Sequence, residues 1–500
     1  MRRRYVSLLL YDTSCKRQET LPLSTSDTRP NAHSAADGRP VIISRAQHNI
    51  SRADISPAAL KVLYRLKDAG YQAFLVGGAV RDLLLGNHPK DFDVATDALP
   101  EEVRRVFRNC RLIGRRFRLA HVHYGDEIIE VATFRASAAP DEVDDEDHRE
   151  IDDNRVQDDS GRLLRDNVYG DINGDVWRRD FTANSLYYNI ADFSVWDYTG
   201  GVADVHDRVL RLIGDPEQRY REDPVRMLRA ARFAAKLGFT VHEATLEPMR
   251  ELADLLGGVP AARLFDECSK LFLSGHGAAS LNRLVAFGLL PHLLPQTADE
   301  LRRDPEGPAA RLLHLGLEGT DARVRADKSV TPTFLYAVLW YGPILRAMKA
   351  RVAAGAPESF AFSEAIDEVV QTAIRRVAVP KRFTLPLKEM LALQPRFERR
   401  DGRRALALLS HPRFRAAYDF MLLRADAGLI STEIADWWTE IQTLDHDGRV
   451  AMVAAAPRSA APVGDEGEAI EATGGEEDRP RRRRRRRRGR GGGGGHSPGE

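Results

Sequence analysis

Two aspartates separated by one residue, Asp91 and Asp93, are the side chains in this sequence whose spacing most clearly suits chemistry. In an extended strand, residues two apart point to the same face, so the two carboxylates would lie side by side. Like charges at that separation repel unless a cation sits between them. Carboxylate oxygens are ligands that divalent ions prefer, and we expect Asp91 and Asp93 to bind Mg²⁺.

A glycine turn precedes these aspartates. The apolar run Ala73–Val76 stops at Gly77 and Gly78, and a helical pattern then covers residues 80–85 up to Gly86. We interpret the run as a buried strand that ends where a ligand or another backbone comes close. Glycine N–H groups near a helix start favour phosphate binding. Each motif alone is common in ordinary turns and surface strands, but in this order they predict one nucleotide–metal site.

A third carboxylate lies on a predicted β-hairpin. The runs 119–124 and 127–134 are strand-like and are separated by Gly125 and Asp126. Glu130 interrupts the second, otherwise apolar run. Two interpretations stay open: Glu130 is an edge residue that faces solvent, or it is a third carboxylate brought to the metal site from a neighbouring strand.

The bulk composition sets the class of protein. With 500 residues, of which 43% are hydrophobic and 29% charged, the chain is long enough for two or three soluble domains. Its three cysteines are widely spaced and odd in number, which argues against a disulfide framework and fits a reducing cytoplasm. No apolar run is long enough to cross a bilayer, and the N-terminus lacks the core and cleavage site of a signal peptide.

The order of predicted elements gives an α+β fold. A helix is predicted from Pro57 to a stop at Gly70, with Ser56 as its N-cap. Residues 178–186 lead into a helix, and residues 195–198 look like the last strand before a Gly-Gly pair. From there to about residue 438 the pattern is helical, so a small mixed sheet is followed by an all-α remainder.

We divide the chain into five parts on this basis. Residues 1–40 and 454–500 cannot bury a core and are expected to be disordered. Residues 41–200 form the head, which contains the sheet and an acidic loop at 136–160. The helical remainder divides into a neck at 201–275 and a body at 276–453.

Two segments carry strong charge of opposite sign. Eleven acidic residues lie within 141–159, and such a block is usually a solvated loop, with a regulatory role as the alternative. Eight arginines in a row occupy positions 481–488 of the tail. A flexible run of arginines binds phosphates without reading sequence, and such binding weakens steeply with salt. An acidic protein, or the acidic loop of this chain, is the alternative partner for the arginines.

The residues around the glycines and aspartates resemble a known superfamily. Gly77–Asp82 (Gly-Gly-Ala-Val-Arg-Asp) and Asp91–Thr96 (Asp-Phe-Asp-Val-Ala-Thr) are similar to the motifs of bacterial poly(A) polymerases and CCA-adding enzymes. The resemblance implies a polymerase-β-like nucleotidyltransferase head with a small mixed sheet, a neck that selects the nucleotide, and a body that binds RNA. It also implies ATP as a substrate and a pair of Mg²⁺ ions that Asp91 and Asp93 bridge.

The resemblance further implies roles for individual residues. Asp180 would join Asp91 and Asp93 in the catalytic group, while Glu130 stays a rival for the third carboxylate. The residues implied to contact the nucleotide are Gly78, Arg81, Arg179, Asp223, Arg226 and Arg229.

Two of these residues, Asp223 and Arg226, would select the base. They lie three apart at a predicted helix start and so share one face, where an acid and an arginine can match the edge of a base. Local sequence alone gives Asp223 a different role, as an N-cap with Pro224 at the first helical position. Both roles are compatible.

The superfamily contains two activities, and two features separate them: one segment of the head and the arginine-rich C-terminal extension. Residues Ile113–Val122 resemble bacterial poly(A) polymerases, and the similarity extends over roughly residues 41–440. We therefore expect a template-independent poly(A) polymerase that adds AMP from ATP to RNA 3′ ends, with a CCA-adding tRNA nucleotidyltransferase as the alternative. A non-catalytic RNA-binding scaffold has no use for two facing carboxylates. The resemblance also implies RNA-degradation and RNA-chaperone proteins as partners, and no membrane.

Overall fold

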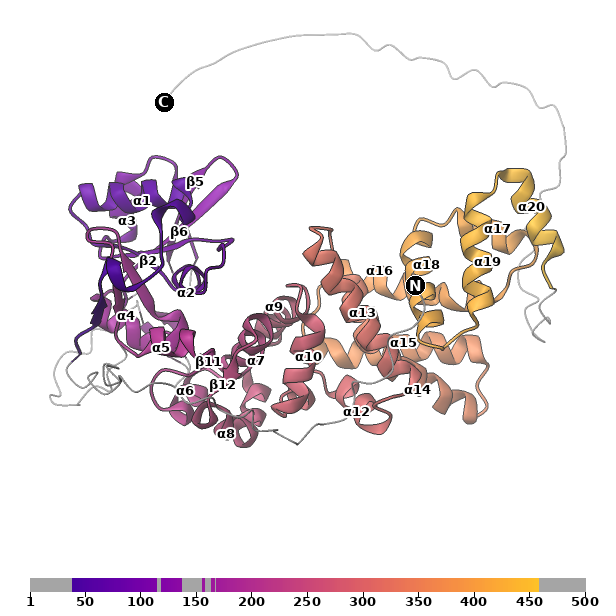
Figure 1. Ribbon diagram of the computed structural model, residues 1–500. Coiled ribbons are helices and arrows are strands. Elements are labelled where there is room, and N and C mark those ends of the chain that lie inside the picture. Colours follow the sequence, from indigo (N-terminus) through magenta and orange to yellow (C-terminus); the bar gives the residue numbers. More distant parts are fainter. Residues whose placement is uncertain (1–37, 115–117, 137–154, 158–162, 167, 458–500) are drawn as a thin grey trace, which may run out of the picture.

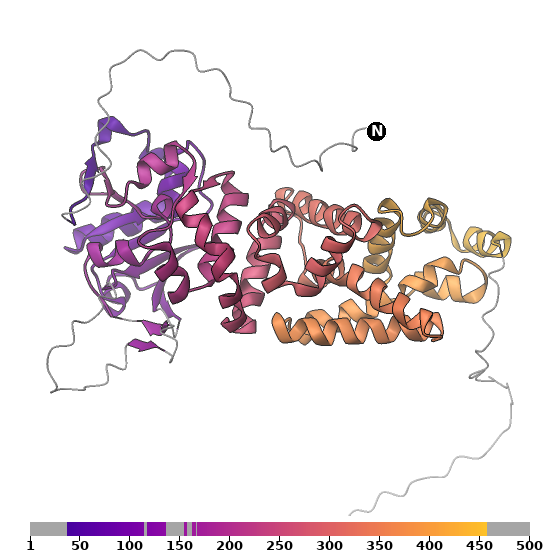
Figure 2. The ribbon, with the colours of Figure 1, turned by 90° about the horizontal axis from the view of Figure 1, so that it is seen from below.

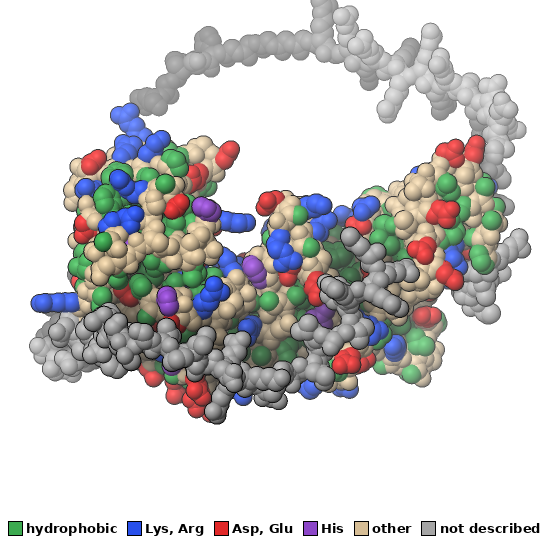
Figure 3. Space-filling model, viewed as in Figure 1, with side chains coloured by type: hydrophobic (Ala, Val, Ile, Leu, Met, Phe, Trp, Pro, Cys, Tyr) green, Lys and Arg blue, Asp and Glu red, His purple; other side chains and the backbone are tan. Residues whose placement is uncertain are grey.

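The computed structural model describes residues 38–114, 118–136, 155–157, 163–166 and 168–457. The described chain forms a curved molecule, with the sheet-containing head at one end and helices that follow one another toward the other end (Figure 1). The space-filling view shows a hollow between the head and the helices (Figure 3). Seen from below, the same parts lie in a row along the sequence order (Figure 2).

One mixed sheet of eight strands organises the head. Only the β3–β6 pair is parallel among the strands of this sheet, and every other neighbouring pair is antiparallel. In spatial order the strands are β1 (Val41–Ile43), β10 (Val195–Asp197), β9 (Leu186–Asn189), β2 (Ala73–Val76), β3 (Asp93–Thr96), β6 (Glu127–Thr133), β5 (Leu119–Tyr124) and β4 (Cys110–Ile113).

The two faces of this sheet are covered differently. Helices α1 (Pro57–Asp68) and α3 (Pro100–Val106) pack on one face, where Leu75, Val94 and Val131 join the main core. On the other face, α4 (Ile172–Arg178) contributes Ile172 and Val176 to a smaller cluster over β2 and β9. The outer strands β4 and β5 present partly exposed side chains on that second face.

Local sequence accounts for the helix starts and stops in the head. The Ser56 hydroxyl accepts a hydrogen bond from the Ala59 N–H at 3.0 Å, and Pro57 occupies the first turn of α1. Helix α2 (Gly78–Leu84) begins two residues earlier than the sequence pattern predicts and ends before Gly86. The predicted strand at residues 73–76, the hairpin and the helix after Pro100 are all confirmed.

The neck contains a feature that the sequence pattern missed. Strands β11 (Val209–Leu210) and β12 (Thr240–Val241) form a short parallel pair inside the region predicted to be all helical. The Thr182 N–H donates to the Arg211 carbonyl at 3.0 Å, so this pair is joined to the head. The helices around it are α5 (Gly201–His206), α6 (Pro216–Glu222), α7 (Val225–Leu237), α8 (Glu243–Leu252) and α9 (Ala261–Phe272).

The remaining described chain is helical, and its buried side chains continue the main core. Trp340 and Tyr336 on the long helix α14, and Trp438 on α19, are among the largest fully buried side chains. The helices are α10 (Gly277–Ala286), α11 (Leu290–Leu293), α12 (Pro295–Arg303), α13 (Pro308–Arg325), α14 (Pro332–Ala353), α15 (Glu358–Arg376), α16 (Lys381–Ala392), α17 (Gly402–Leu409), α18 (Phe414–Asp426), α19 (Thr432–Thr443) and α20 (His446–Ala455). None of the described helices is long and apolar enough to span a membrane.

The α+β fold predicted from the sequence is confirmed, with two local corrections. Residues 178–186 do not lead into a helix: a short 3₁₀ turn, Thr182–Asn184, is followed by strand β9. Tyr187 and Tyr188 favour a strand because large aromatic side chains pack well on a half-buried pleated surface. Part of the predicted acidic loop forms strand β7 (Arg155–Gln157), which pairs with β8 (Leu163–Asp166). Residues 137–154, the arginine run and most of the first 40 residues lie outside the described chain.

Candidate active site

The glycine turn lies where β2 ends and α2 begins. Gly77 has φ +69°, in the left-handed region that strains any residue with a side chain. A side chain at Gly77 would also lie only 3.5 Å from the Arg179 guanidinium. The Gly77 N–H itself donates to the Leu186 carbonyl at 3.2 Å, so what the turn provides is the close approach of Arg179 to the start of α2.

The two aspartates flank a buried anchor. Phe92 is 7% exposed and packs in the main core, whereas Asp91 and Asp93 are both exposed. Only Asp93 belongs to β3, and Asp91 precedes the strand. Asp93 pairs with Val76, the last residue of β2, so it lies beside the glycine turn.

Glu130 is the nearest carboxylate on the neighbouring strand. The parallel pairing of β3 with β6 sets Glu130 directly opposite Asp93. Because β6 lies between β3 and β5, Glu130 is not on an edge strand. Partial burial, followed by the negative charges of Glu130 and Asp91, raises the pKa of Asp93 to about 6, although Arg179 opposes the shift. This concentration of negative charge is the electrostatic environment that a cation would relieve.

The carboxylates do not form a closed metal site by themselves. Within the part of the chain that the structure describes, no three His, Cys, Asp or Glu side chains gather closely enough to hold an ion. Mg²⁺ commonly binds through one or two carboxylates and takes its other ligands from water and substrate phosphates. The oxygen-only donors of Asp91 and Asp93, with their unrelieved charge, fit this second type of site.

Arg179 is held rigidly beside the turn. Its Nε donates to the Asp175 carboxylate at 3.1 Å and to the Tyr187 hydroxyl at 2.8 Å. Its guanidinium lies over the Tyr187 ring, 5.0 Å from the ring centre. Asp175 comes from α4 and Tyr187 from β9, so two elements fix the direction of Arg179. A fixed arginine loses less entropy when it binds a phosphate than a free one does.

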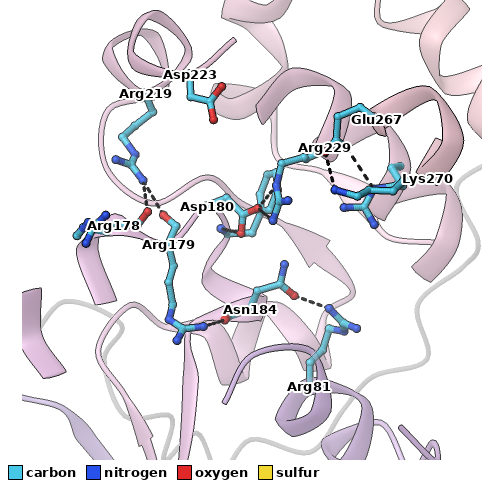
Figure 4. A network of polar contacts seen from close by, with 12 residues as sticks. Arg81, Arg178, Arg179, Asp180, Asn184, Arg219, Asp223, Arg229, Glu267 and Lys270 are labelled. Carbon is cyan, nitrogen blue, oxygen red and sulfur yellow. Dashed lines mark hydrogen bonds and ion pairs between the residues drawn. The ribbon is translucent and has the colours of Figure 1, made fainter. Parts of the chain in front are cut away.

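Arg81 is buried, with only 2% of its surface exposed. Its Nε donates to the Asp82 carboxylate at 2.9 Å, and its Nη1 donates to the side-chain oxygen of Asn184. Figure 4 shows Arg81 and Arg179 reaching Asn184 from different sides, since Arg179 contacts the Asn184 carbonyl. Gly78 packs against the Arg81 guanidinium, so Arg81 supports the wall of the turn in this conformation.

Asp180 lies at the junction of head and neck. Its carboxylate pairs with Arg229 on α7 at 2.6 Å and accepts the Phe181 N–H at 2.9 Å (Figure 4). Burial alone would raise the pKa of Asp180, but Arg229 outweighs it and the pKa is lowered. Asp180 therefore has a cation of its own, unlike Asp93.

Asp223 and Arg226 flank the start of α7 without pairing with each other. Asp223 accepts from Arg263 on α9 at 2.6 Å, and Arg226 donates to the Glu222 carboxylate at 2.9 Å. Pro224, rather than Asp223, is the N-cap of α7. Asp223 still accepts the Val225 N–H at 3.2 Å, so its side chain caps the start of α7 from the position before the N-cap residue.

Several residues of this network were missed in the sequence. Asp175 and Glu222 each lie four residues before the arginine they bind, which is a recognisable helical spacing. Arg263 and Tyr187 gave no such signal, because their contacts join segments that are distant in sequence or lie across a turn.

Profiles of known protein families match three parts of the chain. A family profile described as "Poly A polymerase head domain" matches residues 73–211. Profiles described as "Probable RNA and SrmB-binding site of polymerase A" and "Polymerase A arginine-rich C-terminus" match residues 238–301 and 354–489.

Curated relatives agree with these profiles. Poly(A) polymerase I of Escherichia coli O157:H7 is 50% identical over 404 residues, which is 80% of this chain and 85% of that protein. Poly(A) polymerase I of Haemophilus influenzae is 41% identical over 415 residues, 82% of this chain and 90% of that protein. A CC-adding tRNA nucleotidyltransferase of Halalkalibacterium halodurans is 34% identical, but over only 48% of this chain and 55% of that protein.

Solved structures support the fold. A tRNA-processing enzyme in apo form I matches with a TM-score of 0.51 and 18% identity over 79% of this chain and 93% of that one. A tRNA nucleotidyltransferase complexed with a primer tRNA and an incoming ATP analog matches with a TM-score of 0.50 and 19% identity, over 76% of this chain and 98% of that one. The chain therefore belongs to the bacterial poly(A) polymerase family, within the nucleotidyltransferase superfamily that also contains the CCA-adding enzymes.

Proposed function

We propose that this chain extends RNA 3′ ends with AMP from ATP by a two-metal reaction centred on Asp91 and Asp93. Membership of the family makes the chain a nucleotidyltransferase that adds AMP to RNA. The metal ions, the roles of individual residues and the domain boundaries at 40, 200, 275 and 453 are our proposals. The observation that carries the metal site is the excess of negative charge at Asp93, beside a glycine turn and a fixed arginine.

Asp91 and Asp93 would hold the ions. When bound, a Mg²⁺ pair lowers the pKa of the attacking 3′-hydroxyl and neutralises charge on the transferred and leaving phosphates. Glu130, opposite Asp93, is the better placed third carboxylate, because Asp180 already pairs with Arg229. Asp180 would instead act on the nucleotide indirectly, by holding Arg229 and thereby the start of α7.

The incoming nucleotide would lie between the glycine turn and α7. The turn at Gly77 and Gly78 would bind the triphosphate together with Arg179. Arg81 would support that turn from behind through Asn184. Asp223 and Arg226 would face the base, and their present partners, Arg263 and Glu222, hold each of them in position.

RNA binding would extend beyond the site. Residues 238–301 match a profile whose description names RNA, and we propose that this region and the body contact the RNA strand. The arginines at 481–488 would add affinity that is independent of sequence and sensitive to salt. We propose a cytoplasmic location, which agrees with the free thiols of Cys110 and Cys268, and partners among RNA-degradation and RNA-chaperone proteins.

The test is a product analysis with purified protein. A 5′-labelled RNA is incubated with Mg²⁺ and either ATP or CTP, and a tRNA that lacks its CCA end is supplied with both nucleotides. We expect long products with ATP and little extension with CTP. A clean stop after CCA on the tRNA would contradict the proposal and assign the chain the tRNA-specific activity.

A further inference from the structure

The open part of the second sheet face lies directly beside the reactive carboxylates. One row of paired residues crosses four strands there: Asp93 on β3, Glu130 on β6, His121 on β5 and Arg111 on β4. Side chains alternate between the two faces along a strand, and residues paired across neighbouring strands share a face. All four side chains therefore point to the same side of the sheet. The reacting centre and this row are therefore one continuous surface.

The two sides of Asp93 differ in what they offer. Toward β2 lie the glycine turn and Arg179, which suit a triphosphate. Toward β6 lies the row of Glu130, His121 and Arg111. Nucleotidyl transfer needs the attacking and leaving oxygens in line on opposite sides of the phosphorus. With the triphosphate on the β2 side, the attacking 3′-hydroxyl has to arrive from the β6 side.

The side chains of this surface suit a nucleotide rather than plain solvent. The His121 and His123 rings are 6.5 Å apart at their centres, and His121 Nε2 lies 3.2 Å from the Glu130 carboxylate. Ile128, paired with His123, is 46% exposed, and Arg111 is also exposed. The two rings are inclined at 62° to each other, so a base could stack on one ring face beside the apolar side chain, and the arginine nearby can contact a backbone phosphate.

The surface is also accessible from the hollow of the molecule. Helices α1 and α3 cover the opposite face of the sheet. In Figure 1 they lie on the side of the head away from the helical part, whereas β5 and β6 lie toward it. Lys and Arg side chains line much of the hollow between head and helices (Figure 3), which favours a polyanion there.

We propose that His121 and Arg111, with His123 and Ile128, bind the 3′-terminal nucleotide of the RNA and present its hydroxyl to Asp93 and Glu130. This inference rests on the proposed function, because it assigns the second substrate of the same reaction. It also gives a role to the described end of the segment that resembles poly(A) polymerases: Leu119–Val122 belong to β5, on the RNA side of Asp93, whereas the incoming base would be selected on α7.

The test separates the two substrates in single-turnover kinetics. In His121→Ala and Arg111→Ala we expect the apparent dissociation constant for an oligoadenylate RNA to rise about tenfold, with that for ATP changed less than about twofold. Arg104→Ala is the matched control, since Arg104 is exposed on α3, which covers the opposite face. Equal thermal midpoints would show that each variant folds.

Three results would overturn part of this picture, and they are distinct. Weaker ATP binding with unchanged RNA binding in the two variants would assign the surface to the incoming ATP instead of the RNA. No change in either constant would make it an ordinary solvent face. A wild-type protein that binds ATP and RNA without AMP addition would contradict the proposed function instead.

A second measurement uses the unaltered protein. An RNA ending in 4-thiouridine is cross-linked by light, and the modified peptides are identified by mass spectrometry. We expect cross-links within residues 110–132, and cross-links from 8-azido-ATP outside them. RNA cross-links confined to the neck would refute the inference even if both variants failed to fold.

Discussion

Two sets of carboxylates in this molecule have neighbours of opposite charge, and their pKa values are shifted in opposite directions. Asp93 in the head faces Glu130 and Asp91, and its pKa is raised to about 6. Asp180 and Asp223, at the head–neck junction and in the neck, each bind an arginine at 2.6 Å, and the pKa of each is lowered. Desolvation by the surrounding protein opposes ionisation in all three, although Asp93 keeps some exposed surface, so the difference lies in the charge supplied by neighbours.

The contrast teaches how to separate a ligand site from a structural ion pair. A carboxylate that already has its own arginine contributes to holding two elements together, as Asp180 joins the head to α7. A carboxylate surrounded by others is stabilised by a proton, which is why the pKa of Asp93 is raised, or by a cation from solution. The predictions below test whether removing charge has opposite consequences in the two sets.

The largest expected effect is on catalysis in the head. Replacing Asp91 or Asp93 by Ala should reduce AMP incorporation by roughly 10³-fold or more, because a carboxylate that would hold the ions is lost. RNA binding, measured by filter retention, should stay within about twofold. Near wild-type synthesis by Asp91→Ala would contradict its assignment to metal.

The next effect is on stability at the junction. Arg229→Ala should destabilise the protein by about 2 kcal/mol in denaturant unfolding at pH 7, because Asp180 is left buried without its cation. Asp180 has a lowered pKa, so the stability it contributes is present above its unfolded value near 3.8 and is lost as pH falls through the lower folded value.

A double variant is the control for this assignment. In Asp180→Asn with Arg229→Ala no charge remains uncompensated, so the double variant should be more stable than Arg229→Ala alone. If the stability losses of Asp180→Asn and Arg229→Ala added up to the loss of the double variant, the ion pair would not be what joins these elements.

The sequence predicted the carboxylates of the head better than the arginine partners of the carboxylates at the junction and in the neck. Asp91 and Asp93 could be recognised because alternation around buried Phe92 is a property of a few consecutive residues. The arginine partners could not: Arg263 lies 40 residues from Asp223, and Arg229 lies 49 from Asp180. No local pattern encodes such contacts, which depend on how α7 and α9 pack.

The same limit explains the open question about Glu130. Its interruption of an apolar run was visible, but its position depended on whether β6 lay at an edge or beside β3. The parallel β3–β6 pairing requires a crossover whose direction no short motif specifies. The strand after Asn184 was mistaken for a helix for a related reason, since one of its pairing partners, β2, is distant in the sequence.

A smaller effect of opposite sign is expected at Asp93. In metal-free buffer with a chelator, Asp93→Asn should stabilise the protein by about 1 kcal/mol at pH 8, a value reduced because the side chain is exposed. The folded pKa of about 6 lies above the unfolded value of 3.8, so the native state favours the protonated form. The gain should therefore be full above pH 6, shrink as pH falls and vanish below pH 4. Thermal midpoints at pH 8 and pH 4 measure it, and a loss of stability at pH 8 would contradict the charge argument.

The smallest effect is expected for an ion pair that belongs to neither set. Arg221 and Glu217 on α6 lie 2.7 Å apart, but both side chains are more than half exposed. Water and salt screen such a pair, so Glu217→Ala should change the free energy of unfolding by less than about 0.5 kcal/mol and leave AMP addition unchanged. Unfolding curves in low and high salt provide the measurement. If this variant cost as much as Arg229→Ala, proximity alone would account for the junction, and the distinction drawn from burial and neighbouring charge would fail.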